Sequence, residues 1–196
     1  MPTRADATAL DLVFREARTL RHWVERPIGE DLLREVWTLA RLGPTSGNCS
    51  PARLVFVVSP EAKDRLKPCL SAGNVRQTMA APATAIIGHD LAFYDRLPEL
   101  SPHNDARSWF VGNDALIAET AFRNGSLQGA YFMLAARALG LDCGPMSGFD
   151  NAKVDAAFFA GGTVRSNFLC NLGYGERSHL RPRAPRLAFE DACAVL

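Results

Sequence analysis

One long helical segment, Asp114 to Leu139, constrains the fold of this chain more than any other feature. Its side chains recur at helical spacing, and Gly140 follows as a helix-ending residue. Small residues along the segment predict that another helix approaches it closely. The face defined by the spacing consists of Leu116, Thr120, Leu127, Tyr131, Leu134 and Ala138, and the small residues are Ala121, Gly125, Gly129 and Ala130.

Shorter helix and strand signals lie on both sides of that segment. Gly43-Pro44 ends a helix that begins at Glu30, while Ser59 and Asp150 precede two short helices as capping residues. Further helices are expected over 5–19 and 74–81, and buried strands over 54–58, 84–88 and 168–172. We expect an irregular turn at 143–149, an irregular aromatic binding loop at 89–113, and an extended tail from Gly173.

Strands and helices do not alternate regularly along the chain, as they would in a doubly wound sheet. The sequence also contains no internal repeat and no linker. It therefore predicts a single α+β domain over residues 1–196.

Composition argues against several classes of partner. The net charge is +1, so no strong field attracts nucleic acid or an anionic membrane. There is no apolar run long enough for a transmembrane helix, and Met1 to Leu10 lacks the pattern of a secretion signal, so we expect a cytoplasmic protein. The five cysteines never form CxxC, which disfavours disulfides and zinc sites.

The motifs of several common chemistries are missing. No GxGxxG follows a strand, there is no GxxxxGK[ST] loop and no GxSxG elbow, and the four histidines form no close metal-binding pair. No neighbouring carboxylates suggest glycosidase chemistry. Loops rich in Ser, Thr, Asn and Gly remain, and they suit a polar cofactor better than a protein nucleophile.

Arginines gather near both ends of the chain, where they could converge on one phosphate. A favoured arginine codon usage explains much of their abundance, and a solvated surface remains the alternative for both groups. The first group is Arg15, Arg18, Arg21 and Arg26, and the second is Arg177, Arg181, Arg183 and Arg186.

Four segments resemble the nitroreductase family, in family order and over nearly the whole chain. Arg18 to Trp23 is similar to the family's N-terminal phosphate motif, and Gly43 to Pro51 is similar to its FMN loop. Gly140 to Asp150 is similar to the stretch that lies over one flavin face. The fourth segment is Asn171 to Gly175 with the arginines that follow. The resemblance implies a mixed central sheet flanked by helices, in an intertwined homodimer with FMN at the interface.

The resemblance also assigns the cofactor contacts. It implies that NADH or NADPH gives hydride to flavin N5, that a small-molecule substrate then takes it by ping-pong chemistry, and that no protein nucleophile or metal is needed. The implied contacts are Arg18, Thr19, Arg21, Arg183 and Arg186 at the phosphate and ribityl chain, Asn74 and Gln77 at the polar edge, Pro145, Met146, Ser147 and Gly148 along the ring, and Pro44, Thr45, Ser46 and Asn48 from the other subunit.

The fit is closer to one subfamily, the malonic semialdehyde reductase of Rut pyrimidine degradation. Its marks are Asn48 to Arg53, Phe93 to Pro98, His103 to Phe110 and Glu119 to Asn124. The implied reaction is reduction of malonic semialdehyde to 3-hydroxypropionate, with His103, Arg107 and Trp109 as a substrate lid. Several departures, among them Ala17, Gln77 and Ser147, weaken the case for nitro compounds as the natural substrate.

Other interpretations stay open at this point. The acceptor could be a nitroaromatic, a quinone or an enone; the chain could hold a flavin without turnover; or it could be a basic-tailed interaction protein with no cofactor. Ordinary turn chemistry would explain Thr45, Ser46 and Asn48, and a helix end would explain 145–148. We expect Cys49 to be a packed thiol, and the choice between NADH and NADPH is not visible.

Overall fold

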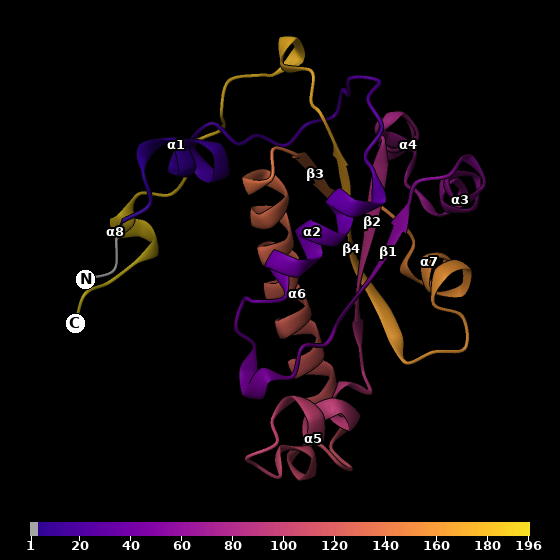
Figure 1. Ribbon diagram of the computed structural model, residues 1–196, viewed down its shortest axis with the longest axis vertical. Coiled ribbons are helices and arrows are strands. Elements are labelled where there is room, and N and C mark those ends of the chain that lie inside the picture. Colours follow the sequence, from indigo (N-terminus) through magenta and orange to yellow (C-terminus); the bar gives the residue numbers. More distant parts are fainter. Residues whose placement is uncertain (1–3) are drawn as a thin grey trace.

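The computed structural model describes residues 4–196, so the first three residues of the expected 1–196 domain lie outside it. Its centre is a four-stranded sheet in the order β1-β2-β4-β3 (Figure 1). The strands are β1 (Ala52–Val57), β2 (Ala83–Asp90), β3 (Asp142–Met146) and β4 (Val164–Gly173). All neighbours among them pair antiparallel. Within residues 4–196, the parallel component of the expected mixed sheet is an isolated bridge between Thr19 and Cys143.

Helices cover both faces of this sheet. On one face, α2 (Glu30–Ala40) and α6 (Asp114–Ala138) pack on alternate residues of β2 such as Ala85 and Ile87. On the other face, α3 (Pro60–Leu66) and α7 (Asn151–Phe158) pack around Ile86 and Leu169. The helix α4 (Ala72–Ala80) lies on this second side as well (Figure 1). Strand β2 is therefore buried on both faces, as expected from its apolar run.

Local capping signals correctly placed several helices. The Ser59 hydroxyl accepts from the N–H of Ala62 at the start of α3, where Pro60 occupies the first turn. The Asp150 carboxylate accepts in the same way from the N–H of Lys153 at the start of α7. The long helix α6 begins and ends close to its expected bounds.

Gly125 and Gly129 of α6 face the sheet, while α6 also packs against another helix, α2. A Cβ at Gly129 would lie 2.5 Å from a ring carbon of Phe168, and one at Gly125 would lie 2.8 Å from the Cβ of His89. Both positions therefore need glycine, because they let the helix lie directly on β2 and β4.

Three other expectations were wrong. The stretch 143–149 is not an irregular turn, because its first half belongs to β3, an edge strand that tolerates Pro145. The expected first helix breaks into α1 (Ala7–Leu10) and a π-helical turn, 11–15. Strand β1 is not buried along its length, because it is an edge strand whose central residues are half-exposed.

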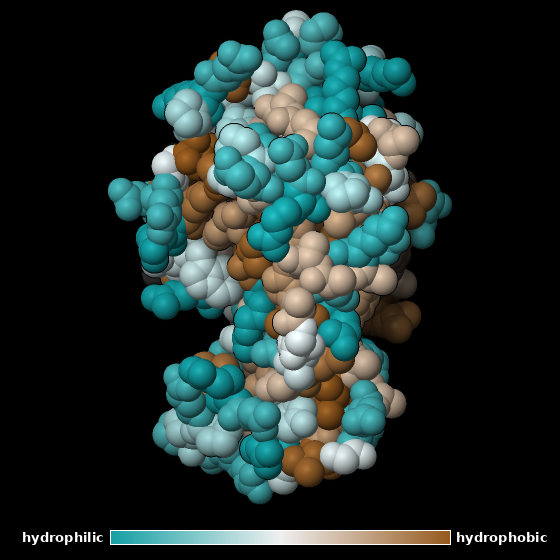
Figure 2. Space-filling model, turned by 90° about the vertical axis from the view of Figure 1, so that its right-hand side faces the viewer, coloured by the Kyte–Doolittle hydropathy of each residue, from teal (hydrophilic) through white to brown (hydrophobic). Residues whose placement is uncertain are grey.

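Residues 89–113 are less irregular than expected. They contain short helical turns at 93–96 and 106–109 and the helix α5 (Leu97–Leu100). Phe93, Leu97 and Phe110 give this segment a small core of its own. It forms the narrower lower lobe of the molecule in Figure 2.

The tail is largely extended, as expected, with a 3-10 turn at 177–179 and the short helix α8 (Phe189–Ala192). Among residues 4–196, no helix combines the length and the apolar character that a membrane span requires.

Candidate functional site

A hollow of about 540 Å³ lies between the segment that follows α1 and the tail that follows β4. Arginine side chains and polar groups dominate its lining, and its carboxylate comes from Glu176. The lining residues are Arg18, Thr19, Leu20, Arg21, His22, Glu176, His179, Leu180 and Arg181. An anionic group such as a phosphate matches this surface.

Backbone hydrogen bonds hold the two sides of the hollow together. The Leu20 N–H donates to the Cys143 carbonyl at 3.0 Å, which adds residues 19–20 to the free edge of β3. The Glu176 N–H donates to the His22 carbonyl at 3.0 Å, which joins the same segment to the tail. A Cβ at Gly144 would lie only 2.6 Å from the Leu20 carbonyl oxygen, so this approach requires glycine.

The tail arginines differ in where they lie. Arg181 lines the hollow, and its carbonyl accepts from Arg18 at 2.6 Å. Arg183 is not part of the lining, and its guanidinium donates to the Ala17 carbonyl at 2.8 Å. Arg186 donates only to the nearby carbonyls of residues 184 and 185. Within one chain, therefore, Arg181 is the tail arginine best placed for an anion, a position that sequence spacing alone could not assign.

The fold also brings His22 close to Glu176 and His179 of the tail. Ligand atoms of His22, Glu176 and His179 lie within 4.8 Å of one another, as a metal site would require, and the two imidazole rings are 4.5 Å apart. Arg18 and Arg21 line the same hollow and repel a cation. The charge balance therefore favours an anion over a metal ion at this place.

A second polar array begins beside that segment and follows the end of β3. The Trp23 indole N–H donates to the Gln77 carbonyl at 3.1 Å, and the Gln77 amide donates to Asn74 Oδ1 at 2.7 Å. The Asn74 amide in turn donates to the Gly148 carbonyl at 2.9 Å. Ser147 beside it is exposed. The structure thus brings both amide residues of α4 to the 145–148 stretch.

Met146 and Pro145 complete that array. Met146 is the last residue of β3, and its sulfur lies 3.5 Å from the Thr78 hydroxyl. Pro145 precedes it on the same edge strand, opposite Cys170 of β4. The predicted contacts 18–21, 74, 77 and 145–148 therefore lie along one continuous edge of the sheet.

The loop 44–52 is held by one stripe of α6. The Ser46 N–H donates to Asn124 Oδ1 and the Ala52 N–H donates to Gln128 Oε1, both at 2.8 Å. One turn further, the Tyr131 hydroxyl donates to the Pro44 carbonyl at 3.1 Å. Asn124 and Gln128 are almost fully buried, and their side-chain oxygens hold the loop in position.

Within that loop, Thr45 and Asn48 are tied to their surroundings. The Thr45 hydroxyl accepts from the N–H of Ser50 at 3.1 Å, and the Asn48 amide donates to the Leu100 carbonyl at 2.7 Å. The loop lies toward the α5 end of α6, whereas the arginine hollow lies toward its other end (Figure 1). A single chain does not bring the two groups of predicted cofactor contacts together.

The three predicted substrate contacts lie on the 89–113 lobe. His103 and Arg107 line a pocket of about 370 Å³. The Arg107 guanidinium already pairs with Asp95 at 3.0 Å. The Trp109 ring is 57% exposed and passes within 3.7 Å of where a Cβ on Gly47 would lie. Trp109 is thus the member of the three that borders the 44–52 loop.

Cys49 is a packed thiol, as expected. Its side chain is buried, and burial raises the pKa of the thiol above its ordinary value. A buried thiol with a raised pKa is a poor nucleophile at neutral pH.

Sequence reasoning did not assign Asn124 or Gln128 to the site, and it named Arg181 only as one of four tail arginines that could reach a phosphate. A signal for the first two was present, because two amides four residues apart interrupt the otherwise apolar and small inner face of α6. Buried amides require partners, and here the partners are backbone N–H groups of the loop. Nothing comparable distinguishes Arg181 from its neighbours.

Comparisons with known proteins identify the family of the chain. The sequence model of the Nitroreductase family matches residues 14–174. A Burkholderia lata protein, provisionally named NADH dehydrogenase/NAD(P)H nitroreductase, is 63% identical over 195 residues and covers 100% of both chains.

Two solved structures show the same fold. One is a provisionally assigned nitroreductase from Exiguobacterium sibiricum in complex with FMN, with a TM-score of 0.85, 19% identity and 100% coverage of both chains. The other is a gut-bacterial enone reductase of fatty acid saturation, with a TM-score of 0.82, 19% identity, and coverage of 97% of this chain and 99% of that one.

Proposed function

The chain belongs to the nitroreductase family, and we propose that it is an FMN-dependent NAD(P)H oxidoreductase that works as a homodimer. One observation carries this proposal: the arginine hollow continues, through Trp23, into the amide array of α4 and the end of β3. A phosphate site and a hydrogen-bonding edge therefore lie side by side, as an elongated cofactor with a phosphate end requires.

The residues present fit FMN by the chemistry of their side chains. Guanidinium groups of Arg18 and Arg21, with the Thr19 hydroxyl, match the phosphate and ribityl oxygens. Asn74 and Gln77 offer amide groups toward the polar edge of the ring. Gly148 leaves room beside Asn74, because a Cβ there would lie 2.4 Å from its amide nitrogen.

When bound, the flavin supplies the hydride-exchange chemistry, and the protein supplies binding and orientation. Arg18 and Arg21 would anchor the phosphate end of the cofactor. The position of the flavin ring would then depend on the edge of the sheet at β3. The buried amides of α6 hold the 44–52 loop in one conformation without taking part in the chemistry themselves. This division of work explains why the chain needs neither a nucleotide-binding motif nor a nucleophile.

We further propose that the second half of each flavin site comes from the partner chain. The loop carrying Thr45, Ser46 and Asn48 lies away from the arginine hollow of its own chain, which a homodimer would remedy (Figure 1). Phe122 and Leu127 are exposed on α6 and are suited to burial by a second copy.

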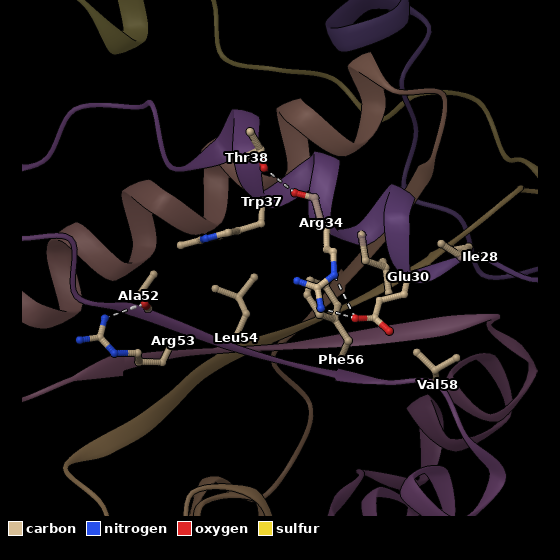
Figure 3. A pocket seen from close by; sticks show the side chains of 11 residues that line it. Ile28, Glu30, Arg34, Trp37, Thr38, Ala52, Arg53, Leu54, Phe56 and Val58 are labelled. Atoms are coloured by element: carbon tan, nitrogen blue, oxygen red, sulfur yellow. Dashed lines mark hydrogen bonds and ion pairs between the residues drawn. The ribbon is translucent and has the colours of Figure 1, made fainter.

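A groove beside the sheet offers a further surface for that second copy. It measures about 810 Å³ and lies between α2 and the edge strand β1 (Figure 3). Trp37, Leu54 and Phe56 make it apolar, and an ion pair between Glu30 and Arg34 closes one side. Edge strands with an apolar groove are places where another chain can add.

For the acceptor, we propose malonic semialdehyde, reduced to 3-hydroxypropionate in pyrimidine degradation, on the strength of the sequence resemblance at 48–53, 93–98 and 103–110. The runner-up is a nitroaromatic, quinone or enone. The name of the B. lata relative supports a nitro acceptor, and the enone reductase with the same fold supports an enone.

The test is purification without added flavin, followed by an absorbance scan, mass measurement in solution, and NADH or NADPH oxidation with each acceptor. We expect a yellow dimer that turns over with malonic semialdehyde faster than with nitrofurazone. Faster turnover with nitrofurazone, menadione or an enone would identify that class of compound as the acceptor instead of malonic semialdehyde. A colourless monomer that takes up no FMN at micromolar concentration would refute the proposed function altogether.

A further inference from the structure

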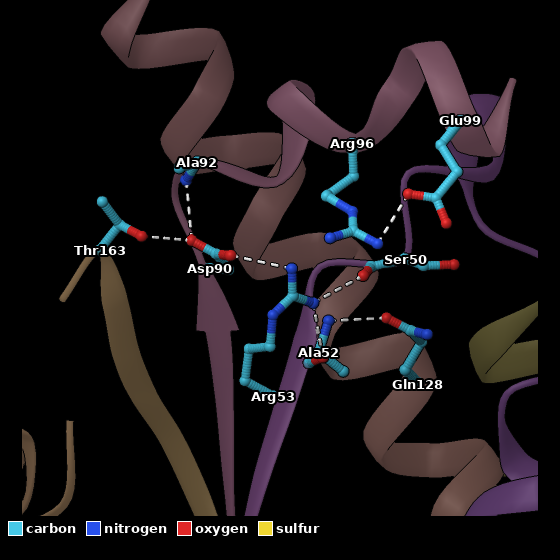
Figure 4. Close-up of polar contacts among 9 residues, drawn as sticks. All are labelled: Ser50, Ala52, Arg53, Asp90, Ala92, Arg96, Glu99, Gln128 and Thr163. Carbon is cyan, nitrogen blue, oxygen red and sulfur yellow. Dashed lines mark hydrogen bonds and ion pairs between the residues drawn. The ribbon is translucent and has the colours of Figure 1, made fainter. Parts of the chain in front are cut away.

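A second polar pocket, of about 500 Å³, lies at the C-terminal end of α2, well away from the arginine hollow. Three arginines from three different elements line it, without any carboxylate in the lining. The lining residues are Trp37, Arg41, Asn48, Ser50, Ala52, Arg53, Arg96, Leu100 and Gln128. Figure 4 shows the guanidinium groups of Arg53 and Arg96 near each other, with Ser50 beside them.

The position of Arg53 is fixed by its neighbours. One terminal nitrogen donates to Asp90 at 2.8 Å, and the other donates to the carbonyls of Ser50 at 3.1 Å and Ala52 at 2.9 Å. Asp90 itself accepts from the N–H of Ala92 at 2.9 Å, outside the pocket lining. The guanidinium is therefore preorganised at the pocket wall.

The other two arginines are more exposed. Arg96 pairs with Glu99 at 2.7 Å, but both side chains are more than half exposed, so the pair is weak and screened. Arg41 follows the last turn of α2 and is exposed. The guanidinium groups of Arg41 and Arg96 can therefore turn toward a ligand without breaking strong contacts.

Backbone strain concentrates at the same pocket. Among residues 4–196, the non-glycine residues with positive φ are Asn48, at 54°, and Ser50, at 40°, and both line it. Such conformations cost free energy and tend to persist at binding sites. Local hydrogen bonds from the Asn48 amide and the Ser50 N–H hold the strained loop in place.

The buried part of the pocket lining provides a further donor. Gln128 is only 2% exposed, and its Oε1 already accepts from the Ala52 N–H. Its amide NH₂ is then the group that a ligand oxygen could use. Guanidinium groups and an amide N–H together match a carboxylate or a phosphate, which present several acceptor oxygens in a small volume.

We propose that this pocket binds the anionic group of a molecule that reacts at the flavin, either the carboxylate of an acidic acceptor or the 2′-phosphate of NADPH. Asn48 connects the two sites, because it lines the pocket and belongs to the loop proposed to reach the partner's flavin. The link to the flavin rests on the function proposed above, whereas anion binding in the pocket does not.

Calorimetric titration of the protein as purified tests the proposal with two matched pairs of probes. One pair is 3-hydroxypropionate and uncharged 1,3-propanediol; the other is adenosine 2′-monophosphate and adenosine. We expect at least one anion to bind saturably and its neutral partner not to. In the double variant Arg41→Gln/Arg96→Gln, binding of that anion should weaken by about tenfold or more.

The control is Lys67→Gln/Lys153→Gln, which removes the same charge from exposed positions outside the pocket. It should bind the anion as the unaltered protein does. Equal binding of anion and neutral partner, or equal binding by both double variants, would overturn the proposal. Flavin absorbance of the same preparations reports on the proposed function separately, so the two failures are distinguishable.

Discussion

The backbone N–H of Ser46 donates to the side-chain Oδ1 of Asn124 at 2.8 Å, and Asn124 is only 1% exposed. The Asn124 amide nitrogen in turn donates to the Thr120 carbonyl at 2.9 Å, within the same helix. Both polar ends of this buried side chain are therefore occupied. It links the middle of α6 to the loop that follows α2.

We expect Asn124→Leu to destabilise the protein by about 1–3 kcal/mol, because it leaves the Ser46 N–H without its acceptor. Urea unfolding measures the loss directly. Glu119→Ala on the same helix is the control, since it removes only an exposed ion pair with Arg123 and should change stability by less than about 0.5 kcal/mol. Similar losses of stability in both variants would contradict the role of Asn124 in holding the loop.

Gly144→Ala should destabilise the fold by about 1–3 kcal/mol, because the new Cβ would meet a backbone oxygen, that of Leu20, at 2.6 Å. The segment that carries Arg18 and Arg21 would have to move away from β3, so FMN affinity should fall as well. Thermal unfolding and flavin titration check the two effects.

The matched substitution for Gly144→Ala is Gly73→Ala in α4, where nothing lies within 4 Å of the added Cβ. It should leave stability unchanged or raise it by up to about 1 kcal/mol. If Gly144→Ala were equally harmless, residues 19–20 would not be packed on β3 as the structure has them.

Arg21→Ala should weaken FMN binding by about tenfold or more, because a charge-assisted hydrogen bond to a phosphate contributes about 1.5–3 kcal/mol. Fluorescence titration of the flavin-free protein gives the dissociation constant. Lys67→Ala removes an equal charge from an exposed position after α3 and should have little effect. If the two variants bound FMN with equal affinity, the phosphate would not bind at Arg21.

Stability should fall as the solution is acidified below about pH 6.5, partly through His89. Burial lowers the pKa of this imidazole, and Arg165 lowers it further, while Asp155 and Asp90 act the other way. Because the folded-state pKa is depressed, the stabilisation exists above the unfolded-state value and disappears as pH falls through the folded-state value.

Substituting His89→Leu isolates that contribution. The Nδ1 atom of His89 is buried without a partner, and the ring packs edge-on against Phe122 at 5.7 Å, so an apolar side chain suits the place. The stability difference between about pH 7.5 and about pH 5.5 should be smaller in the variant. An unchanged difference would assign the acid sensitivity to other groups.

Local signals in the sequence predicted α3, α6 and α7 well. Ser59 and Asp150 accept the hydrogen bonds that caps provide, and α6 follows its periodicity closely. Strand β3 was missed because glycine and proline are turn residues in most contexts. Pro145 is compatible with a strand only at a sheet edge, and edge position is a property of the whole fold.

The sequence predicted which segments contribute to the candidate site, but it did not predict how their side chains are arranged in space. Motif resemblance selected Arg18 to Arg21 and Asn74 to Gln77, and the fold places both beside β3. It could not show that Arg181 lines the hollow whereas the Arg183 guanidinium binds the Ala17 carbonyl. Such distinctions depend on the path of the tail, which long-range contacts determine.

Asn124, Gln128 and Tyr131 can hold the 44–52 loop only while all three lie on the same side of α6. Each residue added to a helix turns everything beyond it by about 100°. A single insertion between Asn124 and Gln128 would therefore keep the contact to Ser46 and swing those to Ala52 and Pro44 away. Related chains should vary freely in the length of their tails or lobes, but hardly at all within these two turns.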